Sequence, residues 1–157
     1  MILLDTSVLS RTLRRRTPGP DERRLATFLD GLLTSDVPVG LPGIVLQEIV
    51  SGIRDEAWFT ELEARLLTSF PIVEATTADH IGAARLRNGC LSHGLTTSAI
   101  DCLIATITMA GGHELFALDD DFRQIAKHTP LRLFRLERTL GPRVVASRRC
   151  VVLRTLG

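Results

Sequence analysis

The chain has 157 residues, of which 45% are hydrophobic and 24% charged, and its formal net charge is +1. This size and balance fit one globular domain with a sizeable core and exclude a disordered polycation. No apolar stretch approaches the ~18 residues of a membrane span and no charged leader precedes the first apolar run, so we expect a cytoplasmic protein. The cysteines at 90, 102 and 150 lack the CxxC spacing of a structural zinc site.

Short apolar strands alternate with amphipathic helices along most of the chain. Strands are expected at 2–5, 37–42, 71–75, 114–119 and 131–136. Helices are expected from a cap at Thr6 or Ser7 onward, over 22–34, from Pro42 to Arg54, over 55–69, from a cap at Thr77 to His93, and over 99–110 after a start at Thr97 or Ser98. Alternation of this kind predicts a three-layer α/β/α sandwich with a mainly parallel central sheet.

The organisation along the chain predicts one domain over residues 1–136 and a basic extension over residues 137–157. The extension holds five arginines and a single acid. It can form an extra strand, an arm for dimerisation, or a frayed or edge-packed end, and we favour the last interpretation.

Four acids stand where a solvated charge is not expected. Asp5 and Asp119 each end an apolar strand, and ligands gather beyond the carboxyl ends of parallel strands. Glu48 and Asp101 lie within apolar helical segments that contain no arginine or lysine. An unpaired buried carboxylate is costly, and like charges brought together repel. A divalent cation would compensate them, and oxygen ligands alone favour magnesium or manganese.

The segments that carry these acids resemble the PIN-domain ribonucleases, and specifically the VapC-type toxins of bacterial toxin–antitoxin pairs. They are LLDTSVL, LPGIVLQEIVSGI, TSAIDCLIATIT and ALDDDF. The resemblance covers residues 1–136 and implies a PIN-like fold. It also implies an acidic quartet that holds Mg²⁺, or Mn²⁺ as a substitute: Asp5, Glu48, Asp101 and Asp119.

Within this quartet the resemblance assigns Asp5, Asp101 and Asp119 to the metal and Glu48 to the orientation of the metal or of a water. Two further positions, Ser7 and Asp121, are expected to assist as neighbours of the metal or at a second ion. Which of the three consecutive acids at 119–121 contact the metal stays open. Position 117 holds alanine where the family often has threonine, so one hydroxyl near the metal is missing.

The implied activity is metal-dependent hydrolysis of RNA phosphodiesters, leaving a 5′-phosphate and a 3′-hydroxyl, by a toxin that inhibits translation. The implied partners are an RNA substrate and a cognate VapB-type antitoxin, with a homodimer and a toxin–antitoxin hetero-oligomer as assemblies. The RNA target stays open. The Arg11–Arg24 cluster of six arginines could contact an RNA backbone or acidic groups of the antitoxin, or it could be a solvated loop.

Other classes fit the same residues less well. A haloacid-dehalogenase-like phosphatase needs an aspartate where Ser7 stands, and a response-regulator receiver needs a lysine at a strand end, whereas Lys127 is expected on a helix. A Toprim-type site leaves Asp5 and Asp101 unexplained. The alternative that remains is a PIN-fold module that binds RNA or protein without cleaving it. The four histidines are not required by the proposed chemistry.

Overall fold

Four short parallel strands form the centre of the computed structural model, which describes residues 1–13 and 19–135. The strands are β1 (Ile2–Leu4), β2 (Val39–Pro42), β3 (Ile72–Val73) and β4 (Glu114–Phe116). Their order across the sheet is β3-β2-β1-β4, so β1 pairs with both β2 and β4. Because every pairing is parallel, the carboxyl ends of β1 and β4 meet at the same edge of the sheet.

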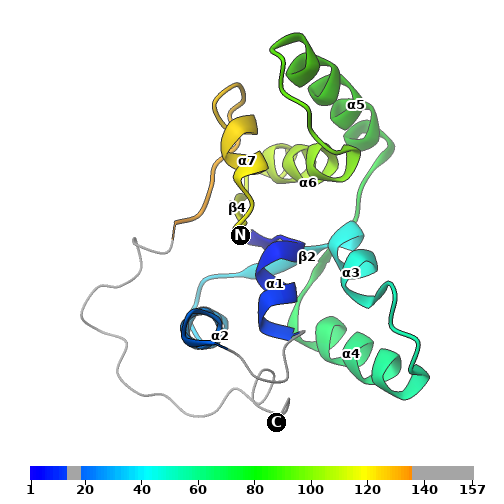
Figure 1. The fold of residues 1–157 in the computed structure, drawn as a ribbon, viewed down its shortest axis with the longest axis vertical. Helices are drawn as coiled ribbons and strands as arrows, with labels where there is room; N and C mark the ends of the chain where they lie inside the picture. Colours follow the sequence, from blue (N-terminus) through cyan, green and yellow to red (C-terminus); the bar gives the residue numbers. More distant parts are fainter. Residues whose placement is uncertain (14–18, 136–157) are drawn as a thin grey trace.

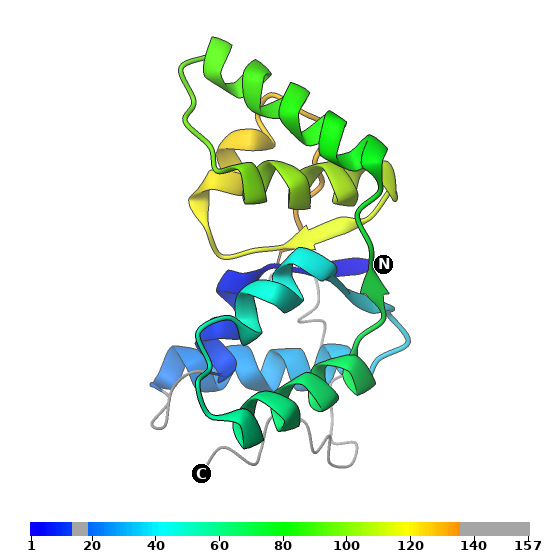
Figure 2. The ribbon, with the colours of Figure 1, turned by 90° about the vertical axis from the view of Figure 1, so that its right-hand side faces the viewer.

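Helices cover both faces of this sheet. Within the described ranges they are α1 (Thr6–Leu13), α2 (Pro20–Leu33), α3 (Gly43–Val50), α4 (Glu56–Ser69), α5 (Thr77–Ser92), α6 (Ala99–Ala110) and α7 (Asp120–Ile125). Figures 1 and 2 show α1 to α4 on one side of the strands and α5 to α7 on the other. The expected three-layer α/β/α sandwich is therefore confirmed. None of these helices is long and apolar enough to cross a membrane.

The strands form because their residues are apolar on both faces, as parallel strands between two helical layers must be. Leu3, Leu4 and Leu115 are completely buried in the core. An aromatic cluster joins β4 to α2, since the ring centroids of Phe116 and Phe28 lie 5.7 Å apart. Phe134 completes the cluster, at 5.5 Å from Phe116 and 6.1 Å from Phe28.

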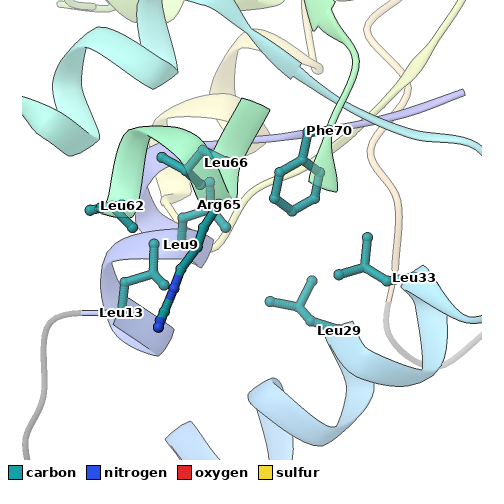
Figure 3. A pocket seen from close by; sticks show the side chains of 8 residues that line it. All are labelled: Leu9, Leu13, Leu29, Leu33, Leu62, Arg65, Leu66 and Phe70. Carbon is teal, nitrogen blue, oxygen red and sulfur yellow. The ribbon is translucent and has the colours of Figure 1, made fainter. Parts of the chain in front are cut away.

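Helices α1, α2 and α4 meet around a small apolar cavity. It is lined by two leucines from α1, two from α2, three residues from α4 and the phenylalanine that follows α4, as Figure 3 shows: Leu9, Leu13, Leu29, Leu33, Leu62, Arg65, Leu66 and Phe70. Its volume is about 20 Å³. Space of this size could hold one water molecule, but the lining offers that water almost no polar partners. The cavity is therefore a packing defect between three helices rather than a ligand site.

Two expected helix caps were wrong. Asp5, and not Thr6 or Ser7, precedes the first turn of α1, and its Oδ2 accepts a hydrogen bond from the Ser7 N–H at 2.9 Å. Thr76, and not Thr77, caps α5, and its hydroxyl and the Asp79 carboxylate form a reciprocal capping box. The apolar periodicity predicted both helices correctly, but each helix start has several adjacent polar residues that can act as the N-cap.

Two expected ends also differ from the structure. Helix α3 ends at Val50 rather than Arg54, and Gly52 then adopts φ +83°, a left-handed conformation that favours glycine. The expected strand at 131–136 is reduced, over its described residues, to a single parallel bridge between Leu133 and Leu115. Residue 136, the extension at 137–157 and the arginines at 14–16 lie outside the described residues.

Candidate metal centre

Asp5 is placed at the carboxyl end of β1, inside the protein. Its backbone N–H donates to the Phe116 carbonyl at 3.0 Å, which continues the pairing of β1 with β4 by one residue. The residue is only 5% exposed, although its carboxylate is polar. A strand that ends in a buried carboxylate is unusual, because aspartate is almost never fully buried without a partner.

The environment of Asp5 disfavours its charged form. Burial is the largest cause and raises the pKa of its carboxyl above the ordinary value. Hydrogen bonds from the Ser7 hydroxyl and from the backbone N–H groups of Ser7 and Thr6 act in the opposite direction without cancelling that effect. The negative charge of Glu48 raises the pKa of Asp5 further, because a nearby like charge disfavours the ionised form.

Glu48 is half-buried on α3 and is held by a neighbour of Asp5. The Thr6 hydroxyl donates to Glu48 Oε2 at 2.5 Å, across 42 residues of sequence. This bond fixes the second acid beside the first. The sequence interpretation missed Thr6, and its place directly after Asp5 was the only signal that could have found it.

Ser7 links the first acid to the loop after β4. Its hydroxyl bonds the Asp5 carboxylate, and its Oγ accepts a hydrogen bond from the Leu118 N–H at 3.0 Å. Since Asp119 is the next residue, Ser7 connects the ends of two adjacent strands that both carry an acid. Ser7 therefore contacts both the end of β1 and the loop that follows β4.

Asp101 and Asp119 both stand at helix N-termini. Asp101 lies half-buried in the first turn of α6, where its carboxylate accepts from the Ser98 hydroxyl at 2.6 Å and its N–H donates to Ser98 Oγ at 2.9 Å. Asp119 is exposed and caps α7 by accepting from the Asp121 N–H at 3.1 Å. Carboxylates are favoured at helix N-termini, so each acid also has a local structural role.

The three consecutive acids have different environments. Asp120 forms an exposed ion pair with Arg123 at 2.7 Å, an interaction that water screens strongly. Asp121 is half-buried, and burial is the first cause that raises the pKa of its carboxyl. The negative charges of Asp119, Asp101 and Asp120, in that order, raise the pKa further. Asp121 therefore shares one region of negative potential with Asp119 and Asp101.

The negative charges of the acids act on one another in two groups. The charge of Glu48 acts on Asp5, and the charges of Asp119 and Asp101 act on Asp121. In the part of the chain that is described, no three Asp, Glu, His or Cys side chains converge closely enough to hold a metal ion. The ion pairs found there involve other acids, so no basic side chain of residues 1–13 and 19–135 compensates either group.

These donors fit a hard divalent cation. All five are carboxylates, which suit Mg²⁺ and Mn²⁺ rather than a soft metal. A buried carboxylate next to a second negative charge also requires compensation, since its cost is large when it stays unpaired. The fit rests on this donor chemistry and on the burial of Asp5.

Comparison with known proteins agrees with the geometry. The family model of the PIN domain matches residues 2–128. The crystal structure of FitAcB from Neisseria gonorrhoeae is 25% identical, with a TM-score of 0.68, over 86% of this chain and 97% of that chain. VapBC2 from Rickettsia felis, bound to a DNA fragment from its promoter, is 20% identical, with a TM-score of 0.69, over 85% and 98%. VapBC-1 from nontypeable Haemophilus influenzae is 13% identical, with a TM-score of 0.67, over 85% and 97%.

The last two likenesses show a shared fold only, whereas the family model covers most of the chain. This chain therefore belongs to the PIN-domain family and has the fold of the VapC toxins of VapBC toxin–antitoxin complexes.

Proposed function

We propose that this protein is a metal-dependent endoribonuclease that acts as the toxin of a toxin–antitoxin pair. The observation that carries the proposal is the buried carboxylate of Asp5, which meets a second acid and has no basic partner among the described residues. Membership of the PIN-domain family supports the same reaction class. Other acids at the same edge of the sheet supply the further ligands that such a site needs.

Each acid has a distinct part in the proposed reaction. Asp5, Asp101 and Asp119 would hold a magnesium ion, or manganese as a substitute, and Asp121 would add a further oxygen at the same ion or at a second one. When bound, the cation supplies charge that shields the phosphate and lowers the pKa of a water. Glu48, fixed by the Thr6 hydroxyl, would orient that water in line with the bond that breaks. Attack at phosphorus releases a 3′-hydroxyl and leaves a 5′-phosphate.

The environments of the three consecutive acids favour two of them for the metal. Asp120 is engaged with Arg123 and exposed, whereas Asp119 and Asp121 share the negative potential of Asp101. A cation near Asp101 would relieve repulsion from Asp119 and Asp121 together. Substitution of Asp120 should therefore reduce cleavage the least of the three, and this makes Asp120→Asn a matched control.

The proposed partners follow from the similar proteins. The similar solved structures include FitAcB, VapBC2 bound to a DNA fragment, and a toxin–antitoxin complex from Klebsiella pneumoniae. By that similarity we infer a cognate VapB-type antitoxin, a homodimer and a toxin–antitoxin hetero-oligomer in the cytoplasm. Three arginines of the Arg11–Arg24 cluster lie in the described residues: Arg11 near the end of α1, and Arg23 and Arg24 near the start of α2. They would contact the RNA backbone.

Cleavage of RNA by the purified full chain tests the reaction. We expect cleavage with Mg²⁺ and none with a chelator. Asp5→Asn should abolish cleavage, and Asp120→Asn should keep most of it. Cleavage that survives both the chelator and Asp5→Asn would come from a contaminant and would remove the support for the nuclease.

The alternative is a PIN-fold module that binds RNA or protein without cleaving it. Each of the four acids implied by the family resemblance is present in the sequence, and this favours the enzyme. Tight RNA binding with no cleavage in Mg²⁺ or Mn²⁺, and no change on Asp5→Asn, would instead establish the binding module.

A further inference from the structure

The segment between α5 and α6 leads directly to Asp101. Residues 93–98 join the two helices, and Gly94 turns the chain there with φ +73°. Ser98 is the N-cap of α6. Its hydroxyl donates to Asp101 Oδ2 at 2.6 Å, and its Oγ accepts from the Asp101 N–H at 2.9 Å. The orientation of the Asp101 carboxylate therefore depends on the orientation of Ser98.

Thr97, which precedes this cap, is anchored to both helices. It is buried, with only 2% of its surface exposed. Its hydroxyl forms a hydrogen bond with Cys102 Sγ, near the start of α6, at 3.1 Å. Its carbonyl accepts from Arg87 Nε on α5 at 3.2 Å. Because the Thr97 carbonyl and the Ser98 nitrogen belong to one planar peptide unit, the bond from Arg87 fixes the plane from which Ser98 starts.

The bond from Arg87 satisfies a carbonyl that has no other partner. Within residues 1–13 and 19–135, no second donor bonds the Thr97 carbonyl, and Arg87 forms no ion pair with an acid. A buried carbonyl that loses its hydrogen bond destabilises the conformation that buries it. Arg87 is itself exposed, so its side chain supplies this donor without belonging to the core.

Helix α5 supports this bond because it packs closely on α6, as Figures 1 and 2 show. A Cβ atom at Gly82 would come within 2.9 Å of Thr106 Cγ2, so the two helices leave little room for a side chain there. Towards the end of α5, the Leu95 N–H donates to the Cys90 carbonyl at 2.9 Å and ties the linking segment to that helix. Arg87 lies between these two attachments and is held by both.

We infer that Arg87 is a positioning residue for Asp101. Its Nε–H holds the peptide between Thr97 and Ser98, and the Ser98 hydroxyl then holds Asp101 Oδ2. In the described part of the chain, Asp101 Oδ1 keeps no hydrogen bond and is available to a cation. The effect on cation binding rests on the proposed function, whereas the effect on the cap does not.

Two substitutions of matched length separate the hydrogen bond of Arg87 from its charge. Glutamine places an uncharged N–H donor at the position of the arginine Nε, whereas methionine places a methyl group there. Arg87→Met should therefore release the cap, and Arg87→Gln should retain it. Arg85→Met, at another exposed position of α5, is the control.

Amide hydrogen exchange of the full chain in chelator measures the cap directly. In Arg87→Met the Asp101 N–H should exchange about 5-fold faster, the size of one ordinary hydrogen bond, whereas Arg87→Gln and Arg85→Met should change it less than about 2-fold. The Asp79 N–H, bonded to Thr76 at the start of α5, should be unchanged in all three and so exclude a general loss of that helix. Unchanged exchange of Asp101 in Arg87→Met would overturn the inference, as would an equal acceleration in Arg87→Gln.

Titration with Mg²⁺ tests the consequence for the metal. Followed by the amide shift of Asp101, binding should weaken about 10-fold in Arg87→Met, the low end for groups that orient a metal ligand, and recover in Arg87→Gln. The Mg²⁺ concentration for half-maximal cleavage should rise by the same factor, while the rate at saturating Mg²⁺ stays near that of the wild type. Equal loss of that rate in both variants would assign the effect to the guanidinium charge on RNA and overturn positioning as its cause. No Mg²⁺ binding by the wild type would reject the proposed metal centre, and the exchange of Asp101 would still decide the positioning.

Discussion

The hydrogen bond between Thr6 and Glu48 provides a prediction that does not depend on activity. If this bond fixes Glu48 beside Asp5, then Thr6→Val and Glu48→Ala must be coupled in their effects on the free energy of unfolding. Valine keeps the β-branched shape of threonine, so its substitution removes the hydroxyl and changes little else in α1. The double variant closes the thermodynamic cycle.

The size of the coupling follows from the geometry. The bond is short, at 2.5 Å, and its acceptor is a half-buried carboxylate. Hydrogen bonds to charged groups contribute about 1.5–3 kcal/mol, and partial solvent exposure of Glu48 places this one near the lower end, about 1.5 kcal/mol. The nearby charge of Asp5 does not remove the coupling energy between Thr6 and Glu48, because Asp5 is present in every variant of the cycle.

Urea unfolding in chelator measures the four free energies. Thr12→Val is a matched control on the same helix, because its hydroxyl bonds the Leu9 carbonyl at 2.9 Å and not Glu48. The control should be additive with Glu48→Ala within about 0.5 kcal/mol. A Thr6 coupling no larger than the Thr12 coupling would refute the view that Thr6 positions Glu48.

Three further outcomes are expected. The raised pKa of Asp5 gives stability that is complete below the ordinary pKa of 3.8 and is lost as pH rises through the folded-state pKa. Asp5→Asn should therefore raise the melting temperature in chelator at pH 7 and not at pH 3, and a fall at pH 7 would contradict the burial argument. Ser7→Ala should leave the Leu118 N–H without its acceptor, at a cost of about 1–3 kcal/mol, and hydrogen exchange at Leu118 should accelerate. Leu29→Ala should enlarge the cavity between α1, α2 and α4 and cost about 2–5 kcal/mol in urea unfolding, whereas Leu67→Ala on the exposed face of α4 should cost far less.

The sequence predicted the order of the elements because each buries a distinct apolar face, and that periodicity is local. It missed the caps of α1 and α5 because adjacent side chains can each accept the same N–H groups, and the fold selects one. It overextended the last strand because the described residues 131–135 meet β4 at a single bridge. Pairing depends on a partner far away in the sequence, which no local pattern records.

The acids at strand ends could be expected at one edge, because parallel strands bring their carboxyl ends together. The link from Thr6 to Glu48 could not be expected, since it depends on a contact between residues 42 apart. The choice among three consecutive acids was open in the sequence. The ion pair of Asp120 with Arg123, one turn along α7, now distinguishes that acid from its neighbours.

The bond between Ser7 and Leu118 joins residues that are 111 apart in the chain, and it has a consequence for synthesis. Strand β1 is made first, but it is central and takes β4, nearly the last element of the domain, as its neighbour. A chain still on the ribosome therefore carries Asp5 without the acids that follow β4, even if its early helices have already formed. The edge that gathers the carboxylates is assembled only when the domain is almost complete, so an unfinished chain lacks it.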